Sequence, residues 1–487
     1  DYFHKLNKFS KERVKDEIDY IGKKSGELGI SNLHIADVNF GMYPQDKLTC
    51  EFLKESKEKY GWPKQIIATT GKNSKDRVTA ITNILGDMFS VNMSMQSMDG
   101  QVLRNIKRAN IKLNHMIDIN YHLIKQGRST KAELIIGLPG ESRETFINGL
   151  NNVLNSNASS VTIYTLMMLH GTEFKKPSYR KQFSYEGKFR IVPLNFGEYN
   201  GKRIFDYEEV GVVTKDMSFE DYLYLRVLAL FVESLHNGKP FNEFFLYAKQ
   251  HNIQPATFLK ILNDNIKNAS TNIQNLVSDF INETKGELWD SEKDLLNYYR
   301  NDENYLKLKN GEVGGNLIYK YKSKNLVKNS QDWLVFFEKE LYKAIINNQN
   351  DISNSDLIKL EMAEISKFCK LKLHGLLNPS IESTSIGATF SYDILKWIDN
   401  YDENKALSNY IFGYEERLIF EYTNDQKLVR DDVFKRYGTN INALSKIVTR
   451  ISNLESQFRK VRYGNDKFLR DVYKKVGESF TKYALSN

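Results

Sequence analysis

Between residues 10 and 166 the sequence alternates short apolar runs with amphipathic helical segments. This alternation restricts the fold more than any other feature, because a strand must pair and an amphipathic helix must cover a sheet. Five runs are predicted to be strands: residues 33–37, 65–68, 89–92, 130–136 and 160–166. Strands separated by helices at this spacing predict a parallel sheet with right-handed crossovers.

The clearest unit of this alternation lies in residues 130–142. A short apolar run that holds Glu133 breaks at the Gly-Leu-Pro-Gly sequence of residues 137–140, and a helical segment follows from residue 143. Ligands of βα folds bind at the carboxyl ends of the strands, where this loop would lie. Gly140 would let backbone approach a ligand, and Glu141 would lie at a helix N-terminus, which favours negative charge. Taken alone, the stretch is equally compatible with a purely structural turn.

Polar residues follow each predicted strand, and parallel strands bring such residues to one edge of the sheet. No glycine-rich phosphate fingerprint follows the first strand, so an open βα barrel is favoured over a doubly wound sheet. Amides, hydroxyls and carboxylates dominate, without a nucleophile–His–acid set or a spaced Cys/His metal set. Such groups suit a polar, zwitterionic or ribose-bearing ligand. The candidate ligand-binding residues at these strand ends are Asp37, Asn39, Thr70, Asn92, Gln96, Ser97, Glu133, Gly137, Pro139, Gly140, Leu166 and Met167.

The alternation stops after Gly171, and three regions are predicted. Residues 1–172 form the α/β region, and residues 173–215 form an irregular connecting segment with short strands or a hairpin. Residues 216–487 are predicted to be mostly helical, beginning with a helix capped by Ser218 and including helices over 392–398 and 467–483.

Charge and cysteine content limit the partners and the compartment. The net charge is +8, but lysines alternate with acidic residues along most helices, as on solvated faces, so nucleic-acid binding is not expected. The two cysteines, Cys50 and Cys369, are far apart, which predicts no disulfide framework and a cytoplasmic location. No apolar run approaches the ~18 residues of a membrane span.

Several ordered motifs resemble a known family. They are Ile-Ala-Asp-Val-Asn-Phe-Gly at 35–41, Met-Gln-Ser-Met-Asp at 95–99 continuing into 102–111, the segment 133–141, and Leu-His-Gly-Thr at 169–172. Segments 196–199, 207–209 and 217–222, followed by Arg226, extend the set. Together they resemble the radical S-adenosylmethionine (SAM) enzymes, especially those that carry a cobalamin-binding domain. The main resemblance covers roughly residues 1–172.

This resemblance implies a partial (β/α)6 barrel that binds SAM and a [4Fe-4S] cluster, cleaving SAM reductively to a 5′-deoxyadenosyl radical. The intact enzyme would perform methyl transfer or rearrangement on an unidentified small metabolite. The resemblance also implies that cobalamin could take part in the reaction and that a reductant such as flavodoxin or ferredoxin would supply electrons.

By position, the resemblance assigns Asp37 and Asn39 to the amino end of the methionine moiety. Gln96 and Ser97 would lie near the ribose and carboxylate, and Arg108 could pair with that carboxylate. Ile135 with residues 137–140, and Leu166 with Met167, would pack around the adenine. Thr70, Asn92 and Glu133 complete the predicted SAM-binding set.

The chain departs from the family in one respect: the Cys-x3-Cys-x2-Cys loop and the first barrel strand are missing. The sequence is therefore interpreted as a fragment that begins just after that loop, with natural loss of the cluster as the alternative. As it stands, the chain is expected to hold no cluster and to be inactive. Two other hypotheses remain: a non-catalytic barrel that binds a nucleoside-like ligand or a protein partner, and a tRNA-modifying relative, for which no RNA-binding appendage is visible.

Overall fold

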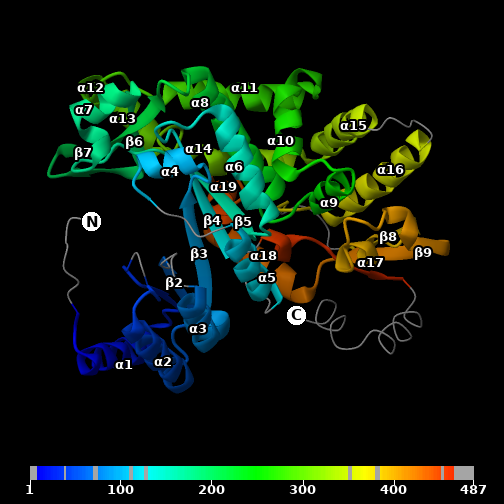
Figure 1. Cartoon of the computed structure of the whole chain (residues 1–487), viewed down its shortest axis with the longest axis horizontal. Helices are drawn as coiled ribbons and strands as arrows, with labels where there is room; N and C mark the ends of the chain where they lie inside the picture. The colour runs from blue at the N-terminus through cyan, green and yellow to red at the C-terminus, as the bar shows by residue number, and fades with distance from the viewer. Residues whose placement is uncertain are drawn as a thin grey trace. The chain divides into compact units, whose positions relative to one another are not determined.

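The computed structural model describes residues 8–37, 40–69, 75–108, 113–125, 130–348, 354–378, 384–450 and 454–464 (Figure 1). The chain divides into two compact units, residues 1–164 and residues 165–487. The division falls before the boundary predicted at residue 172. None of the described helices combines the length and the apolar character that crossing a membrane requires.

The first unit is built on a five-stranded sheet whose strands follow chain order. The neighbouring pairs from β1 to β4 are parallel, so the predicted mixed α/β fold with a parallel sheet is confirmed. The strands are β1 (Asn32–His34), β2 (Gln65–Thr69), β3 (Phe89–Gln96), β4 (Thr130–Ile136) and β5 (Ser160–Thr165). All five predicted strands are present.

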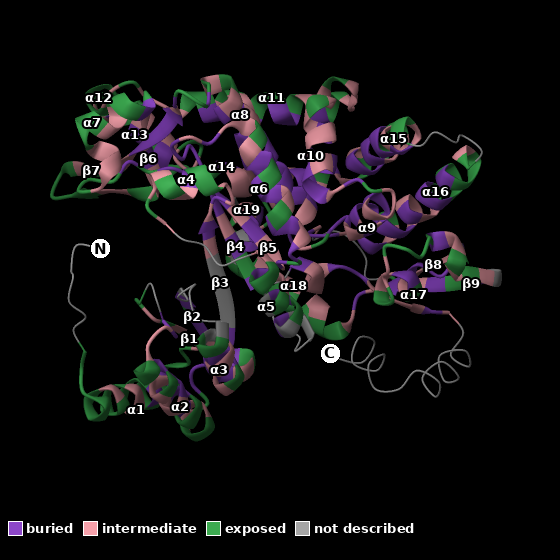
Figure 2. Ribbon diagram, viewed as in Figure 1, coloured by how far each residue is buried: buried purple, intermediate pink, exposed green. Residues whose placement is uncertain are grey.

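Sequential strand order distinguishes this sheet from a doubly wound one, in which the order reverses at a switch point. A partial barrel is compatible with this order and stays a prediction. The helices of the unit are α1 (Lys11–Leu28), α2 (Pro44–Tyr60), α3 (Lys75–Leu85), α4 (Gly100–Asn105), α5 (Leu113–Lys125) and α6 (Arg143–Asn155). Their burial differs: α1 buries only Gly22 and Ser25, whereas α6 buries six residues (Figure 2).

The second unit contains one long β-hairpin in the segment predicted to be irregular. β6 (Glu186–Tyr199) and β7 (Lys202–Val213) pair antiparallel, after η2 (Glu173–Lys175) and α7 (Pro177–Phe183). The two-residue turn Asn200–Gly201 has φ of 49° and 73°, and Asn-Gly favours such turns because both residues tolerate positive φ. A hairpin was one of the alternatives predicted for this segment, and the Asn-Gly pair marks its turn in the sequence.

A helical assembly follows the hairpin. α8 (Phe219–Phe231) is almost entirely buried and continues into a π-helical turn, Val232–His236. The next helices are α9 (Asn242–Gln250), α10 (Pro255–Asp264), α11 (Thr271–Gly286), α12 (Glu292–Arg300), α13 (Asp302–Lys309), α14 (Leu317–Lys328), α15 (Ser330–Asn348) and α16 (Ser355–Lys372). Trp333 of α15 lies at the centre of an aromatic core, with its ring centroid 5.1 Å from Phe231 and 5.8 Å from Phe337.

A small antiparallel sheet, which the sequence did not predict, completes the second unit. β9 (Ile411–Glu421) lies between β8 (Ile386–Tyr392) and β10 (Lys460–Tyr463). β8 packs against α16, and α17 (Ile394–Asp399) follows β8. α19 (Ile441–Arg450) packs against α14 and α18 (Asn424–Tyr437). The predicted helix over 392–398 is shorter than expected because Tyr392 ends β8. The helix predicted over 467–483 lies outside the described residues.

Candidate functional site

The chain turns sharply where β3 ends, and this turn positions the first candidate residues. The register between β3 and β4 shifts between Ser94 and Gln96, and Gln96 adopts a φ of +63°. The Ser97 backbone N–H then donates to the carbonyl of Met95 at 2.8 Å. A bulge of this kind redirects the strand and re-aims the side chains that follow it.

Ser97 is bonded to a carboxyl group from the next strand-end loop. Its Oγ donates to Oε1 of Glu141 at 2.5 Å and accepts from the Asp99 N–H at 3.1 Å. Both side chains are buried, and Oε2 of Glu141 has no hydrogen-bond partner. Burial raises the pKa of Glu141 to about 8; the Ser97 hydrogen bond opposes this shift and the Asp99 charge adds to it. Glu141 is therefore mainly protonated at pH 7, unlike the exposed anion expected at a helix N-terminus.

A second link joins the same two loops through Asn105. Its Nδ2 donates to the carbonyl of Pro139 at 2.8 Å. Gly140 has a φ of +86°, and a Cβ at this position would lie 2.5 Å from Nδ2 of Asn105. The space beside Gly140 therefore accommodates Asn105 of this chain, rather than being open for a ligand.

Arg108 lies beside the bulge and Glu133. Its Nη2 donates to the Ser94 carbonyl at 3.2 Å, and Ser94 is paired in register with Glu133 of β4. Burial lowers the pKa of Arg108, while the Glu133 charge raises it. A half-buried guanidinium at the end of a parallel strand is suited to bind a carboxylate.

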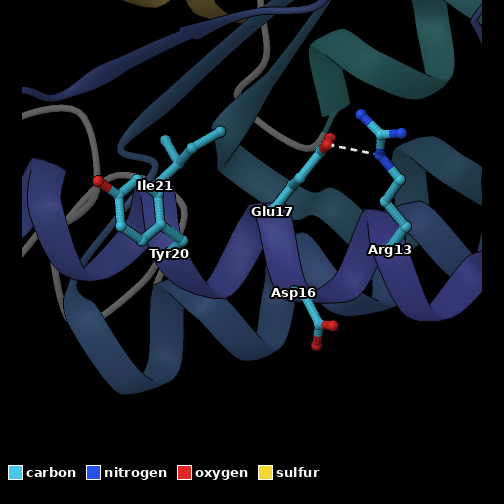
Figure 3. A pocket seen from close by; sticks show the side chains of 5 residues that line it. All are labelled: Arg13, Asp16, Glu17, Tyr20 and Ile21. Carbon is cyan, nitrogen blue, oxygen red and sulfur yellow. Dashed lines mark hydrogen bonds and ion pairs between the residues drawn. The ribbon is translucent and has the colours of Figure 1, made fainter.

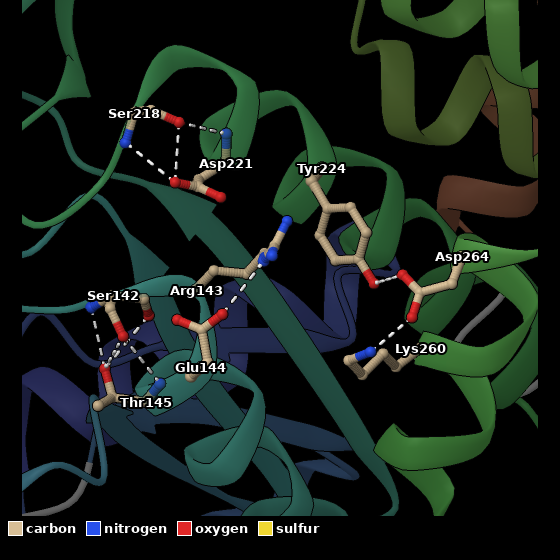
Figure 4. Close-up of polar contacts among 9 residues, drawn as sticks. All are labelled: Ser142, Arg143, Glu144, Thr145, Ser218, Asp221, Tyr224, Lys260 and Asp264. Carbon is tan, nitrogen blue, oxygen red and sulfur yellow. Dashed lines mark hydrogen bonds and ion pairs between the residues drawn. The ribbon is translucent and has the colours of Figure 1, made fainter.

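Both loops lead directly into capped helices. Asp99 accepts from the Gln101 and Val102 N–H groups at the start of α4. Ser142 and Thr145 form a capping box at the start of α6; Figure 4 draws this box and, from the second unit, the equivalent Ser218–Asp221 box of α8. Caps of this kind fix where each helix begins and so hold the preceding loop in place.

The structure brings together part of the predicted set. Gln96, Ser97, Arg108, Glu133, Pro139 and Gly140 belong to the linked strand ends, and Gly137, with φ +96°, ends β4. Asp37 follows β1 and is exposed. Asn39 and Thr70 lie outside the described residues, as does the side chain of Asn92.

Leu166 and Met167 fall in the second unit, where both are engaged by β7. The Leu166 carbonyl accepts from the Gly211 N–H at 3.0 Å, and Met167 forms a bridge with Val210. Their assignment to the adenine stays a prediction.

The predicted set of SAM contacts leaves out Asp99, Asn105 and Glu141. From the sequence, Glu141 was placed in the strand-end loop and Asp99 in a family motif, whereas Asn105 was not singled out. An Asp before an amphipathic segment indicates a helix cap, which is the role of Asp99. Asn105 and Glu141 act through partners more than thirty residues away, and no local pattern could have indicated these pairings.

The cysteines of this chain do not fit an iron–sulfur cluster. Cys50 is buried in α2, where burial raises the pKa of its thiol to about 12, and Cys369 is buried in α16, with its pKa also raised by burial. Thiolates ligate such clusters, usually four of them, whereas this sequence holds two cysteines, one in each of two helices. In the part of the chain that the structure describes, no three His, Cys, Asp or Glu side chains are grouped to hold a metal.

An open depression on α1 lies apart from the predicted residues. Its volume is about 490 Å³, and it is lined by Arg13, Asp16, Glu17, Tyr20 and Ile21 (Figure 3). Nε of Arg13 donates to Glu17 at 2.9 Å, an exposed pair within one helix. None of these residues belongs to the predicted site.

The fold and the site define a mixed α/β protein with polar groups linked at the carboxyl ends of parallel strands. No protein-family model matches the chain. A similar protein is the cobalamin-dependent radical SAM methyltransferase TokK of Streptomyces tokunonensis, 29% identical over 271 residues. Another is the 2-(S-pantetheinyl)-carbapenam-3-carboxylate methyltransferase of Streptantibioticus cattleyicolor, 30% identical over 265 residues. The predicted resemblance to cobalamin-type radical SAM proteins is therefore confirmed.

These alignments cover 53% of this chain and 38% of each relative, so the chain spans well under half the length of the relatives. Among solved structures, radical SAM methyltransferase TsrM of Kitasatospora setae, with cobalamin and a [4Fe-4S] cluster bound, aligns with a TM-score of 0.28 and 15% identity over 32% of this chain and 31% of its own. The radical SAM coproporphyrinogen III oxidase HemN of Escherichia coli aligns with a TM-score of 0.27 and 17% identity over 34% and 40%. Alignments this limited do not establish a shared fold.

Proposed function

We propose that the first unit is the SAM-binding part of a radical SAM methyltransferase that acts on a small molecule. The observation that carries this proposal is the linkage of the β3 and β4 ends through Ser97, Glu141, Asn105 and Arg108. The similarity to TokK supports the class of reaction. The predicted partial barrel is part of this proposal.

In this proposal Arg108 binds the carboxylate of the methionine moiety, since it is half-buried and its Nη2 donates to the Ser94 carbonyl beside the bulge. Glu141 is a positioning residue: its hydrogen bond fixes the Ser97 hydroxyl beside the bulge. SAM, when bound, supplies the transferable methyl group. The remaining predicted contacts in this unit are Asp37, Asn39, Thr70, Asn92, Gln96 and Glu133. The roles of Leu166 and Met167, which belong to the second unit, stay predictions.

The residues of this chain do not fit the [4Fe-4S] cluster, so no step is assigned to it here. In a protein that extends beyond this sequence, other segments would hold the cluster and cobalamin, and a flavodoxin or ferredoxin would supply electrons. The two-cysteine content favours a second candidate: a non-catalytic barrel that binds a nucleoside-like ligand.

Calorimetry of the chain with SAM, S-adenosylhomocysteine and adenosine tests the proposal. SAM should bind saturably. Arg108→Gln should weaken the affinity for SAM at least about tenfold, because a charge-assisted hydrogen bond is lost. Arg104→Gln is the matched control, since Nη2 of Arg104 bonds Gln101 on the exposed face of the same short segment.

Two results would reject the proposal: no binding of SAM, or an equal response of the Arg104 and Arg108 variants. If adenosine binds as tightly as SAM and Arg108→Gln leaves both unchanged, the nucleoside-binding candidate is preferred. Arg108→Lys, which keeps the charge, should recover part of the affinity.

A further inference from the structure

Arg226 is a buried cation without a partner in the second unit. It lies on α8 with 6% of its surface exposed, and its Nε has no hydrogen-bond partner. The guanidinium carbon of Arg226 lies 5.7 Å from the centroid of the Phe280 ring of α11. Within the described residues, no carboxylate is paired with it. A buried guanidinium without acceptors is unfavourable, because its N–H groups have lost their hydrogen bonds to water and have formed no hydrogen bonds within the protein.

Two hydroxyl groups in the same helix interface are also unsatisfied. Tyr222 lies one turn before Arg226 on α8, and Thr284 lies one turn after Phe280 on α11. Both residues have no exposed surface, and neither the Tyr222 hydroxyl nor Oγ1 of Thr284 has a hydrogen-bond partner. α8 and α11 pack against each other, so the three groups belong to one interface.

The register of the two helices follows from one contact at each end of the interface. Arg226 lies at the level of Phe280. At the other end of the interface, Nη1 of Arg190 donates to Glu287, which follows α11, at 3.0 Å. Tyr222 of α8 also lies near Arg190, close enough to affect its pKa. The helices therefore run antiparallel, and Thr284 falls between the levels of Arg226 and Tyr222.

We propose that Arg226, Tyr222 and Thr284 form an oxyanion-binding site between α8 and α11, which takes a carboxylate or phosphate group. Arginine offers only donors, and both hydroxyls are free to donate, so the set matches a ligand group that only accepts. The nearby carboxylates, Glu208 and Glu287, are both bonded to Arg190.

Other buried cations of this unit show what Arg226 lacks. Lys322 is bonded to Glu233 at 2.7 Å, and Lys372 is bonded to both carboxylate oxygens of Glu243 at 2.7 Å. Each buried lysine thus has an anion supplied by the chain. At Arg226 the anion would come from a ligand.

Thermal unfolding of the chain in sodium phosphate, sodium acetate or sodium chloride, at equal ionic strength, tests the site. A bound anion stabilises the folded chain in a saturable way, whereas general salt effects do not saturate. Saturation with phosphate indicates a phosphate-bearing ligand, and saturation with acetate alone indicates a carboxylate-bearing one. Arg226→Met should weaken the apparent affinity at least about tenfold. Arg300→Met, at an exposed arginine of α12, should leave it unchanged.

If Arg226→Met does not fold, Tyr222→Phe and Thr284→Val serve instead, because each removes one hydroxyl and keeps the shape. Each substitution should weaken the apparent affinity for the anion about threefold or more. Tyr224→Phe should leave this affinity unchanged, because the Tyr224 hydroxyl donates to the exposed Asp264 and not to the site (Figure 4). The proposal is overturned if neither anion gives saturable stabilisation, or if the wild type and the site variants respond alike.

Discussion

The two units bury polar groups in different ways. In the first unit, the candidate-site groups lie in loops at strand ends and are linked by hydrogen bonds, as between Ser97 and Glu141. In the second unit they lie inside helix interfaces as ion pairs between distant segments, such as Lys372 with Glu243. Parallel strands bring polar residues to a predictable edge, whereas helix packing pairs residues that no sequence pattern relates. Substitutions in each unit should therefore fail for different reasons.

The largest effect is expected from Lys372→Met in the second unit. It leaves the buried Glu243 without its cation, which should lower the free energy of unfolding by ~3–5 kcal/mol in urea denaturation. The double variant Lys372→Met/Glu243→Leu should recover most of this loss, because no buried charge remains. Lys307→Met, at an exposed pair with Glu303, should lower the free energy of unfolding far less, because exposed ion pairs are screened by solvent. Equal losses at the two lysines would show that the buried ion pair contributes no more to stability than the exposed pair does.

In the first unit, Glu141 should make stability fall as pH rises. Its pKa is about 8 in the folded chain against 4.5 ordinarily, so between these values only the folded state holds the proton. Stability is then full below about pH 4.5 and decreases through pH 8, by on the order of a few kcal/mol. Glu141→Gln should flatten this decrease. Unfolding can be followed by the fluorescence of Trp62, the tryptophan of this unit. Glu144→Gln, on the exposed first turn of α6, should leave the slope unchanged.

Gly140→Ala tests the close approach of the two strand-end loops. Positive φ alone costs about 1 kcal/mol, as expected for Gly61→Ala, where a Cβ would meet nothing within 4 Å. At Gly140 the Cβ would also displace the Asn105 amide, so a total of ~2–3 kcal/mol is expected. Adding Asn105→Ala should remove the excess in thermal unfolding. If the two glycine variants lose the same stability, Asn105 does not occupy that space.

The smallest difference is expected at the helix caps, where the units should behave alike. Ser142→Ala in α6 and Ser218→Ala in α8 each remove a capping-box acceptor and should each cost ~0.5–2 kcal/mol in thermal unfolding. Both effects depend on local backbone groups rather than on the surrounding fold. A large difference between them would show that a cap also carries tertiary contacts.

Local patterns predicted much of the fold. The five strands and the α8 start at Ser218 follow from residue alternation, helical spacing and capping chemistry, all encoded within a few residues. The β8–β9–β10 sheet was missed because Lys460 pairs with Glu421 and Ile386 with Phe420, pairings that span tens of residues. The candidate site shows the same division: Ser97 and Glu141 were each placed at strand ends from the sequence, but the hydrogen bond that joins them across forty-four positions was not predicted.

The β6–β7 hairpin determines where the chain could be shortened. Phe189 and Trp289 exchange two backbone hydrogen bonds at 2.8 Å, and the hairpin residues Ile191 and Phe205 share a core with Leu295 and Leu308. Residues 214–288, which include helices α8 to α11, therefore connect the two halves of a single packed body. A polypeptide ending anywhere between residues 214 and 288 would keep the hairpin but leave its apolar face open to water, inviting self-association. A stable shorter version should extend at least through α13.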